Sequence, residues 1–421
     1  MVSARIIPLL LSSTHPRTPG NEHALQRPLA PGWVALAFLA VLGLQNTAHA
    51  SEELGPEPRQ EWAQTSSTLA ACDEGTTQQI ACGILGTQSR TCTGGQWGPY
   101  GTCSAPSSIS LQVSGRKDLV FDAKRSLLYI TTGGTSGEVR VYNVRTRLFE
   151  PSLLTGGSFS GIDLSPDGDQ LLVADLLTDA NTNQNWIHHV NLVTRTPRKI
   201  LFTRDYGEGG TFTVVFTSNT EALVTSQYNG SGWVPMRKVN LTDGTAHSIA
   251  SVRQATMLAR SADGSTVGYA ESNISSGEWG RYTVGAQTFA ESSTSWFVYE
   301  IAVSRQASQY ALPTYGGLYI FDGALSRQAI LGTYARQLPI GAAYNPVADE
   351  LYLAWYGSST SIDVYSTTTL QKLRDIAPTP GLFSWTGNNA FNNGRMRVSL
   401  DGALLFATTG SSGLGIYLTG R

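Results

Sequence analysis

Charged residues are scarce in this chain, at 14% of 421 residues, and the formal net charge is only −2. The chain therefore lacks the basic surface with which proteins bind nucleic acid, and we expect no nucleic-acid partner. Glycine, in contrast, is abundant at 44 residues. Few charges together with much glycine, serine and threonine favour many short strands and tight turns over helices.

Histidine is also rare, and the motifs of common enzymes are missing. Only His188, His189 and His247 follow the first fifty residues, and the first two are adjacent. Neighbours on a strand point to opposite faces, so these two cannot share a metal. No G-x-S-x-G, H-E-x-x-H or Walker-type loop occurs. The sequence thus predicts no metal, no cofactor and no catalytic residue.

Long apolar runs are absent as well. The longest, Val34 to Leu44, has the length of a signal-peptide core and is too short to span a bilayer. Ala48 and Ala50 supply small residues where a signal peptidase cleaves. We interpret residues 1–50 as a signal peptide cleaved after Ala50. The expected product has no membrane span and is secreted, periplasmic or at the cell surface.

The four cysteines all lie in one short segment. Residues 51–71 are polar and read as a linker, and residues 72–104 then hold Cys72, Cys82, Cys92 and Cys103. A clustered even set in an exported chain predicts disulfides, and the absence of a C-x-x-C pair argues against zinc. Three pairings are possible, and the sequence does not choose among them.

This cysteine-rich segment resembles a thrombospondin type-1 repeat. The resemblance rests on Cys82-Gly83, on Gln88-x-Arg90 ahead of a cysteine, and on Trp97 and Tyr100 spaced by three. It implies a ladder in which Arg90 stacks between the aromatic rings. The family normally has six cysteines and places its aromatics before the Cys-Gly strand, and this chain does neither. The segment is then either a disulfide-linked spacer or an adhesive module for glycans or matrix.

From residue 105 onward the chain repeats one pattern: a strand, a polar turn, a second strand and a third alternating strand. Equivalent positions recur at a mean spacing of about 46 residues, the period of a four-stranded propeller blade. Seven copies are present: Val120 to Gly134, Asp163 to Asp175, Val215 to Tyr228, Ala259 to Ser272, Ala302 to Gly317, Ala343 to Gly357 and Val398 to Gly410.

The last copy lacks a fourth strand, and a lone strand precedes the first copy. That lone strand, at about residues 108–114, would complete the final blade and remove two open sheet edges. We therefore predict an all-β protein in which residues 105–421 form a seven-bladed β-propeller with four-stranded blades, closed by this N-terminal strand.

The repeats resemble the bacterial YVTN-type and lactonase-like propellers. The residues that carry the resemblance are the Asp-Gly turns ahead of apolar strands, at Ser165 to Gly168, Ala262 to Gly264 and Leu400 to Gly402. The resemblance implies the propeller fold. It implies little about function, because this fold hosts many unrelated activities, and no catalytic motif of the lactonase-like members is present to carry over.

Aromatic and arginine residues gather in the loops of one expected rim. In a propeller, the loops between blades and those joining the second and third strands of a blade lie on the same rim. Such residues supply contact area and planar donors, which favours binding of a glycan, peptide or protein. The alternative is that several of the aromatics fill gaps between blades. The candidates are Arg116, Tyr206, Trp233, Arg253, Trp279, Trp296, Arg336, Trp355 and Trp385.

Trp385 is the strongest of these candidates, because it lies in the insertion Gly381 to Gly394, which lengthens the last repeat to about 53 residues. The favoured hypothesis is a non-enzymatic binding or scaffolding protein of a bacterial envelope. One alternative is a structural adhesin or matrix protein acting through the cysteine-rich segment. A second is a lactonase-like hydrolase, for which the carboxylates nearest the expected rim are Asp118, Asp175, Asp205, Glu208, Glu271 and Glu278.

Overall fold

The computed structural model describes residues 71–332, 338–357, 361–376, 378–379, 381–383, 389, 391, 393–410 and 412–420. The predicted signal peptide, and all of the predicted linker except Ala71, lie outside these residues. The chain divides into two units, Met1–Ser67 and Thr68–Arg421, and the described residues belong to the second. They form strands, turns and loops, with no helix long and apolar enough to cross a membrane.

The cysteine-rich segment folds as a small three-stranded antiparallel sheet. Its strands are β1 (Thr77–Cys82), β2 (Gly86–Thr93) and β3 (Gln96–Trp97). Disulfides join Cys72 to Cys92 and Cys82 to Cys103. The predicted disulfides are confirmed, and their pairing, which the sequence left open, is first with third and second with fourth.

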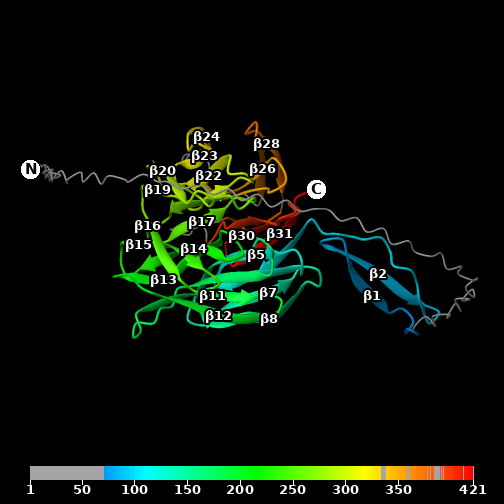
Figure 1. Ribbon diagram of the computed structural model, residues 1–421. Coiled ribbons are helices and arrows are strands. Elements are labelled where there is room, and N and C mark those ends of the chain that lie inside the picture. Colours follow the sequence, from blue (N-terminus) through cyan, green and yellow to red (C-terminus); the bar gives the residue numbers. More distant parts are fainter. Residues whose placement is uncertain are drawn as a thin grey trace, which may run out of the picture. The chain divides into compact units, whose positions relative to one another are not determined.

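Seven four-stranded antiparallel sheets follow in the described residues, each built from consecutive strands except the last (Figure 1). Blade one is β5 (Arg116–Asp122), β6 (Leu127–Thr132), β7 (Gly137–Asn143) and β8 (Leu148–Gly157). Blade two is β9 (Phe159–Leu164), β10 (Gln170–Asp175), β11 (Gln184–Asn191) and β12 (Thr196–Thr203). Blade three is β13 (Glu208–Phe216), β14 (Glu221–Tyr228), β15 (Trp233–Asn240) and β16 (Ala246–Arg253).

The next three blades have the same plan. Blade four is β17 (Thr256–Arg260), β18 (Thr266–Glu271), β19 (Gly277–Thr283) and β20 (Thr288–Thr294). Blade five is β21 (Ala302–Val303), β22 (Gln309–Thr314), β23 (Gly317–Asp322) and β24 (Arg327–Leu331). Blade six is β25 (Pro339–Tyr344), β26 (Glu350–Trp355), β27 (Ile362–Ser366) and β28 (Lys372–Ile376).

Blade seven combines strands from opposite ends of the propeller. It consists of β29 (Met396–Val398), β30 (Leu404–Thr408), β31 (Gly413–Leu418) and β4 (Ser108–Gln112). Leu111 lies opposite Leu414, and Ile109 lies opposite Ile416. The predicted seven-bladed propeller and its closure by the N-terminal strand are confirmed.

The core consists of seven separate clusters, one between each pair of neighbouring blades. Alternation along a strand produces this arrangement, because successive side chains point to opposite faces of the sheet. Leu171 and Val173 pack between blades one and two, whereas Leu172 and Ala174 on the same strand pack between blades two and three. The last cluster joins Phe406 and Ile416 of blade seven to Leu128 of blade one.

The turns between first and second strands of blades two, four and seven share one hydrogen-bonding scheme. The Ser165 hydroxyl donates to Asp167 Oδ1 (2.5 Å) and accepts from the Gln170 backbone N–H (2.9 Å). Ser261 and Asp263 repeat the scheme at 2.6 Å. Gly168 and Gly264 follow with φ of 74° and 73°, a backbone conformation that glycine adopts without strain.

Candidate functional site

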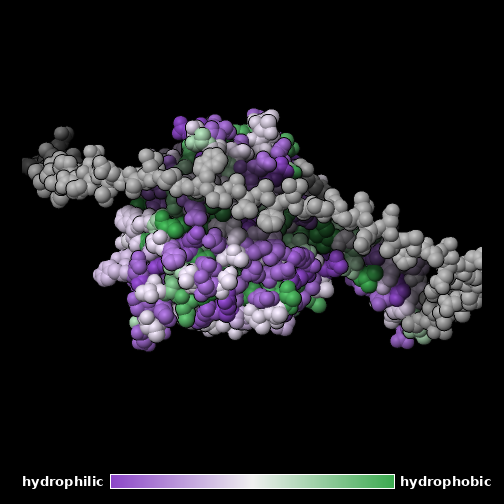
Figure 2. All heavy atoms as spheres, viewed as in Figure 1, coloured by the Kyte–Doolittle hydropathy of each residue, from purple (hydrophilic) through white to green (hydrophobic). Residues whose placement is uncertain are grey.

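Three of the candidate aromatics are exposed in the rim loops. The exposed fraction is 95% for Tyr206, between blades two and three, 58% for Trp233, at the start of β15, and 39% for Trp296, between blades four and five. Figure 2 shows a molecular face on which apolar residues are scattered among hydrophilic ones. Large aromatic side chains left in water, as these three are, are candidates for contact with a partner.

Tyr228 organises the loops that carry Tyr206 and Trp233. Its ring packs against Gly207 and Gly232, where an added Cβ would lie 2.3 and 2.7 Å from ring atoms. The Asn229 backbone N–H also donates to Gly207 O (2.7 Å). Gly207 follows Tyr206, and Gly232 precedes Trp233. Because both glycines pack on the Tyr228 ring, that ring presents the two exposed aromatics together.

The guanidinium group of Arg253 packs against one face of the Trp233 indole. Its guanidinium carbon lies 4.8 Å from the centre of a Trp233 ring, and its side chain donates to Ser231 Oγ. The Arg253 backbone N–H donates to Glu271 Oε1 (2.9 Å). Arg253 itself is only 7% exposed. It therefore fixes the plane of the Trp233 indole and offers little surface of its own.

Trp296 packs in the same manner on another loop. An added Cβ on Gly316 would lie 2.5 Å from the Trp296 indole, and Tyr315 lies with its ring centre 6.4 Å away. The loop between β22 and β23 thus forms the floor beneath Trp296. Tyr206, Trp233, Arg253 and Trp296 together are named the aromatic rim below.

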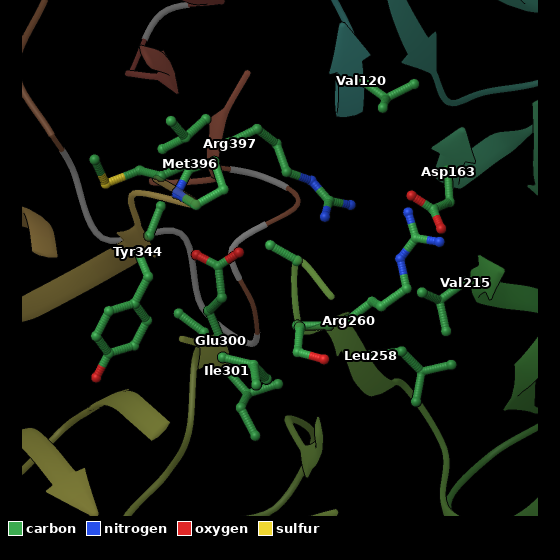
Figure 3. A pocket seen from close by; sticks show the side chains of 18 of the residues that line it. Val120, Asp163, Val215, Leu258, Arg260, Glu300, Ile301, Tyr344, Met396 and Arg397 are labelled. Carbon is green, nitrogen blue, oxygen red and sulfur yellow. The ribbon is translucent and has the colours of Figure 1, made fainter. Parts of the chain in front are cut away.

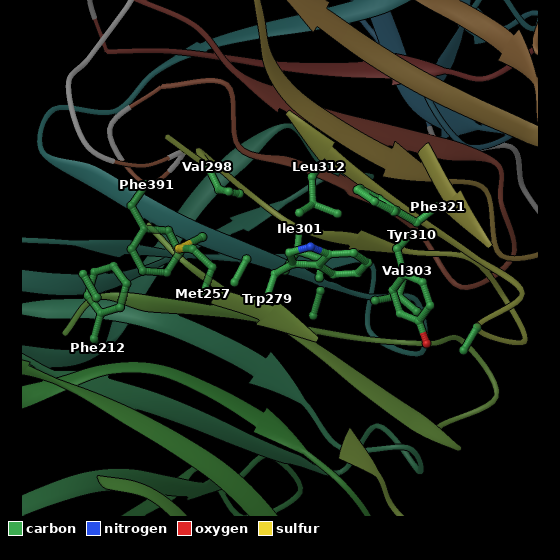
Figure 4. Packing of buried hydrophobic residues seen from close by; sticks show 14 residues of the cluster. Phe212, Met257, Trp279, Val298, Ile301, Val303, Tyr310, Leu312, Phe321 and Phe391 are labelled. Carbon is green, nitrogen blue, oxygen red and sulfur yellow. The ribbon is translucent and has the colours of Figure 1, made fainter. Parts of the chain in front are cut away.

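Three other candidates lie in the interior, and the exposure expected of them is wrong. Trp279 is fully buried between blades four and five, 4.3 Å from Phe321 between ring centres (Figure 4). Trp355 is buried between blades five and six and donates to Asp363 Oδ2 (2.9 Å). Arg116 is 6% exposed and donates to Gly413 O (2.8 Å). Trp279 and Trp355 lie on middle strands of their blades, whose side chains pack against the next blade, and Arg116 begins β5 and bonds the backbone of blade seven.

Arg336 and Trp385 lie outside the described residues. The described parts of the insertion around Trp385 nevertheless place two phenylalanines in the core. Phe383 is buried between blades six and seven, and Phe391 lies with its ring centre 4.9 Å from that of Phe212 on blade three. Blades three and seven are not neighbours in the ring, so Phe391 reaches across the central channel (Figure 4).

A cavity of about 160 Å³ occupies the channel, lined by the first strands of the blades. Its lining includes Ser261, Arg305, Pro346 and Leu400, which follow the first strands of blades four to seven. It therefore opens on the side of the turns between first and second strands, away from the aromatic rim. Apolar walls come from Val120, Val215, Leu258, Ile301 and Met396 (Figure 3).

Buried charges cross the inner end of this cavity. Arg395 donates to both oxygens of Asp118 (2.8 and 3.1 Å) and to Glu300 Oε1, and Arg397 donates to Asp118 Oδ2 (2.9 Å). Burial opposes ionisation of Asp118, but the two arginines outweigh it and hold its pKa below the ordinary value. Burial instead raises the pKa of Glu300 to about 7, despite Arg395 and Arg397.

The carboxylates considered for a hydrolase make structural bonds. Asp175 accepts from Trp186 Nε1 (3.0 Å) and pairs with His188 (2.9 Å). Glu208 is buried and paired with Arg237. Glu271 accepts the backbone N–H groups of Arg253 (2.9 Å) and Glu278 (3.1 Å). These three side chains tie loops and blades together.

The sequence did not single out Arg260, Glu300, Arg305, Arg395 or Arg397 as site residues. Each lies on or next to a first strand of the repeat, and the first strands line the channel of a propeller. Because the chain has few charges, charged residues at those positions were the sequence signal that could have identified these site residues.

In the cysteine-rich segment, the predicted stacking of Arg90 is present. Its guanidinium carbon lies 5.0 Å from the Trp97 ring centre and 4.7 Å from that of Tyr100. Gln78 Oε1 accepts hydrogen bonds from Arg90 Nε (2.7 Å) and from the Tyr100 hydroxyl (3.1 Å). The three side chains form one exposed ladder on the small sheet.

Fold and channel together define the chain as a seven-bladed β-propeller, and solved structures agree. Similar chains occur in the crystal structure of the mitotic checkpoint complex (TM-score 0.55, 13% identity, 74% of this chain and 95% of that one) and in hydrazine synthase of Kuenenia stuttgartiensis (0.56, 12%, 74% and 97%). A third is the β-propeller domain of Cps50 (Swd1) from Myceliophteria thermophila (0.53, 10%, 74% and 99%).

At these identities the likeness concerns the fold alone. No protein-family model and no curated protein matches the sequence. The function therefore has to be argued from the chain's own residues.

Proposed function

We propose that this chain is an exported, non-enzymatic binding protein that uses the aromatic rim to hold a protein or peptide partner. The observation that carries the proposal is Trp233, 58% exposed yet stacked on the buried Arg253. A rigid, exposed indole over an arginine is the side-chain composition of energetic centres in protein interfaces. Tyr206 and Trp296 extend the same surface.

Two further observations support this proposal. One of the similar chains belongs to the mitotic checkpoint complex, and another is the β-propeller domain of Cps50. The two disulfides suit an oxidising compartment, as the predicted signal peptide of residues 1–50 requires. Kinship with the YVTN-type propellers, and the boundaries at residues 51–71, 72–104 and 105–421, remain part of the proposal.

The test is an array of peptides and glycans probed with the full exported chain and two variants. We expect the double variant Tyr206→Ala/Trp233→Ala to bind a peptide at least tenfold more weakly than the unchanged chain, since each lost aromatic anchor costs about 2 kcal/mol. The matched control is Leu373→Ala, which removes a 53% exposed apolar side chain from an outer strand. Equal binding by both variants would contradict the proposal, and signals confined to glycans would replace the peptide partner with a sugar.

The second candidate is adhesion through the cysteine-rich segment, favoured by the exposed ladder of Arg90, Trp97 and Tyr100. This ladder supports the kinship with thrombospondin repeats. The disulfides hold the segment together without it, so Arg90→Gln tests the ladder alone. If the arrays lose their signal with Arg90→Gln and keep it with the rim variant, adhesion by the ladder is the function.

A further inference from the structure

We propose that the channel cavity binds a small hydroxylated organic oxyanion, a carboxylate or a phosphate ester, between Arg260 and Arg305 and beside Glu300. This site lies at the channel end opposite the aromatic rim, so it is separate from the function proposed above. It follows from charge, from one buried carboxyl group and from the shape of the cavity.

The charge of the cavity is positive. Arg260, Arg305, Arg395 and Arg397 line it, with Asp163 and Glu300 as its acidic side chains. Arg395 and Arg397 bond the buried Asp118 behind the wall. Arg260 and Arg305 form no ion pair with any residue that the structure describes, and Arg260 donates to the Leu164 carbonyl (3.3 Å). Two guanidinium groups are therefore left to bind an anion, and their planar donors fit carboxylate and phosphate oxygens.

Glu300 supplies the second observation. It is 2% exposed, its Oε1 accepts from Arg395, and it extends into the cavity in Figure 3. Its Oε2 is buried without a hydrogen-bond partner in the described part of the chain. Buried polar atoms are nearly always satisfied, so an open one in a cavity wall indicates a ligand. When protonated, Glu300 donates from this oxygen to an oxyanion.

The charged and titratable groups around Glu300 decide how binding depends on pH. They are Arg395, Arg397, Asp118, and the cavity residues Arg260, Arg305, Asp163 and Tyr344. An arriving anion adds negative charge beside Glu300 and so favours its protonated form. By linkage, the anion binds more tightly as the pH falls through about 7, the pKa of Glu300 in the free protein.

Size and surroundings define the rest of the ligand. A volume of about 160 Å³ holds a molecule the size of a sugar acid and not a polymer. A second hollow shares Arg305 and Tyr344 with the cavity, and its lining includes the polar side chains of Gln309, Gln328 and Asn345 and one acidic residue, Asp349. A ligand whose anionic group lies among the arginines of the cavity, and whose hydroxyl groups face the second hollow, fits both spaces.

The experiment is titration calorimetry of the full chain with glucuronate, glucose 6-phosphate, inorganic phosphate and glucose. We expect binding of at least one organic anion and at least tenfold weaker binding of glucose. The anion that binds more tightly identifies carboxylate or phosphate ester as the ligand class. Binding of inorganic phosphate alone, equal affinity for glucose, or no binding of any anion would overturn the proposal.

Variants locate the site. Arg260→Gln and Arg305→Gln each remove charge-assisted hydrogen bonds and should weaken the anion about tenfold. Arg327→Gln, an exposed arginine on β24 without a described ion pair, is the matched control. Trp233→Ala on the aromatic rim should leave anion binding unchanged, which separates this site from the proposed function. Unchanged affinity in both arginine variants would refute the assignment.

Glu300→Gln tests whether the protonated carboxyl group of Glu300 donates a hydrogen bond to the anion. The wild-type affinity should fall about tenfold between pH 6 and pH 8, and the amide, which donates a hydrogen bond at every pH, should make affinity nearly independent of pH. Thermal unfolding of each variant confirms that it is folded. A Glu300→Gln protein that keeps the wild-type pH profile would exclude Glu300 from the site.

Discussion

The two ends of the central channel are built from different kinds of chain segment. At one end the loops differ from blade to blade, carry Tyr206, Trp233 and Trp296, and leave these rings in water. At the other end three turns share a Ser-x-Asp-Gly hydrogen-bonding scheme, and charged side chains face the cavity among apolar ones. The comparison shows that the repeated scaffold varies in its rim loops, whereas its inner strands and the residues next to them carry both paired charges, such as Arg395 with Asp118, and arginines without an ion pair among the described residues, Arg260 and Arg305.

The largest effect we expect comes from the buried charges of the channel. Arg395→Met leaves the buried Asp118 with Arg397, whose side chain is 25% exposed, as its remaining ion-pair partner among the described residues. We expect the free energy of unfolding to fall by about 3–5 kcal/mol, as when one partner of a buried ion pair is removed. Urea denaturation measures it, with the exposed Arg145→Met as control. A loss no larger than that of the control would show that the channel charges are not structural.

The next test compares two tryptophans that the sequence treats alike. Trp279→Ala removes a fully buried indole and should cost about 3–5 kcal/mol, because a cavity remains between blades four and five. Trp233→Ala removes an exposed one, together with its contact to Arg253, and should cost less than about 1 kcal/mol. Denaturation midpoints of both variants measure the loss in stability, and similar losses in the two variants would contradict the assignment of Trp233 to the surface.

A third test concerns the pH dependence of stability. The pKa of Glu300 is about 7 in the folded protein and 4.5 by the ordinary value, so between these pH values the folded state holds a proton that the unfolded chain releases. Stability from Glu300 is therefore present below about pH 4.5 and is lost as the pH rises toward 7, by about 1–3 kcal/mol. Unfolding of wild type and Glu300→Gln across this range should diverge, and parallel curves would exclude the raised pKa.

The smallest effect is expected at Tyr206, which is 95% exposed. Tyr206→Ala should change the free energy of unfolding by less than about 0.5 kcal/mol, as for other exposed positions. Thermal unfolding measures this, and a larger loss would mean that the ring is packed and not available to a partner.

The fold was predictable because each blade repeats the same short sequence pattern. Asp-Gly turns, alternating strands and a period of about 46 residues specify a blade, and the strand left over near Ile109 specifies the closure. Such signals are local in sequence, and they need no knowledge of which side chains meet.

The candidate site was predictable only in part, because it depends on strand ends and on distant pairs. Whether a tryptophan near a strand end faces water or the next blade depends on its place along the strand. Trp233 is the first residue of β15, whereas Trp279 is the third residue of β19 and is enclosed between blades four and five. The contact of Arg395 with Glu300 joins positions 95 residues apart. No pattern within a single repeat contains that information.

The pairing of β4 with β31 has a consequence for how the molecule reaches its native state. Ile109 and Ile416 are neighbours in one sheet although almost the whole propeller separates them in sequence. A chain that emerges progressively from the ribosome, or from a translocation pore, holds an unpaired edge until its final strand arrives. Assembly of the complete ring is then a late and slow event, and the interval before it is when the polypeptide is most open to aggregation and proteolysis.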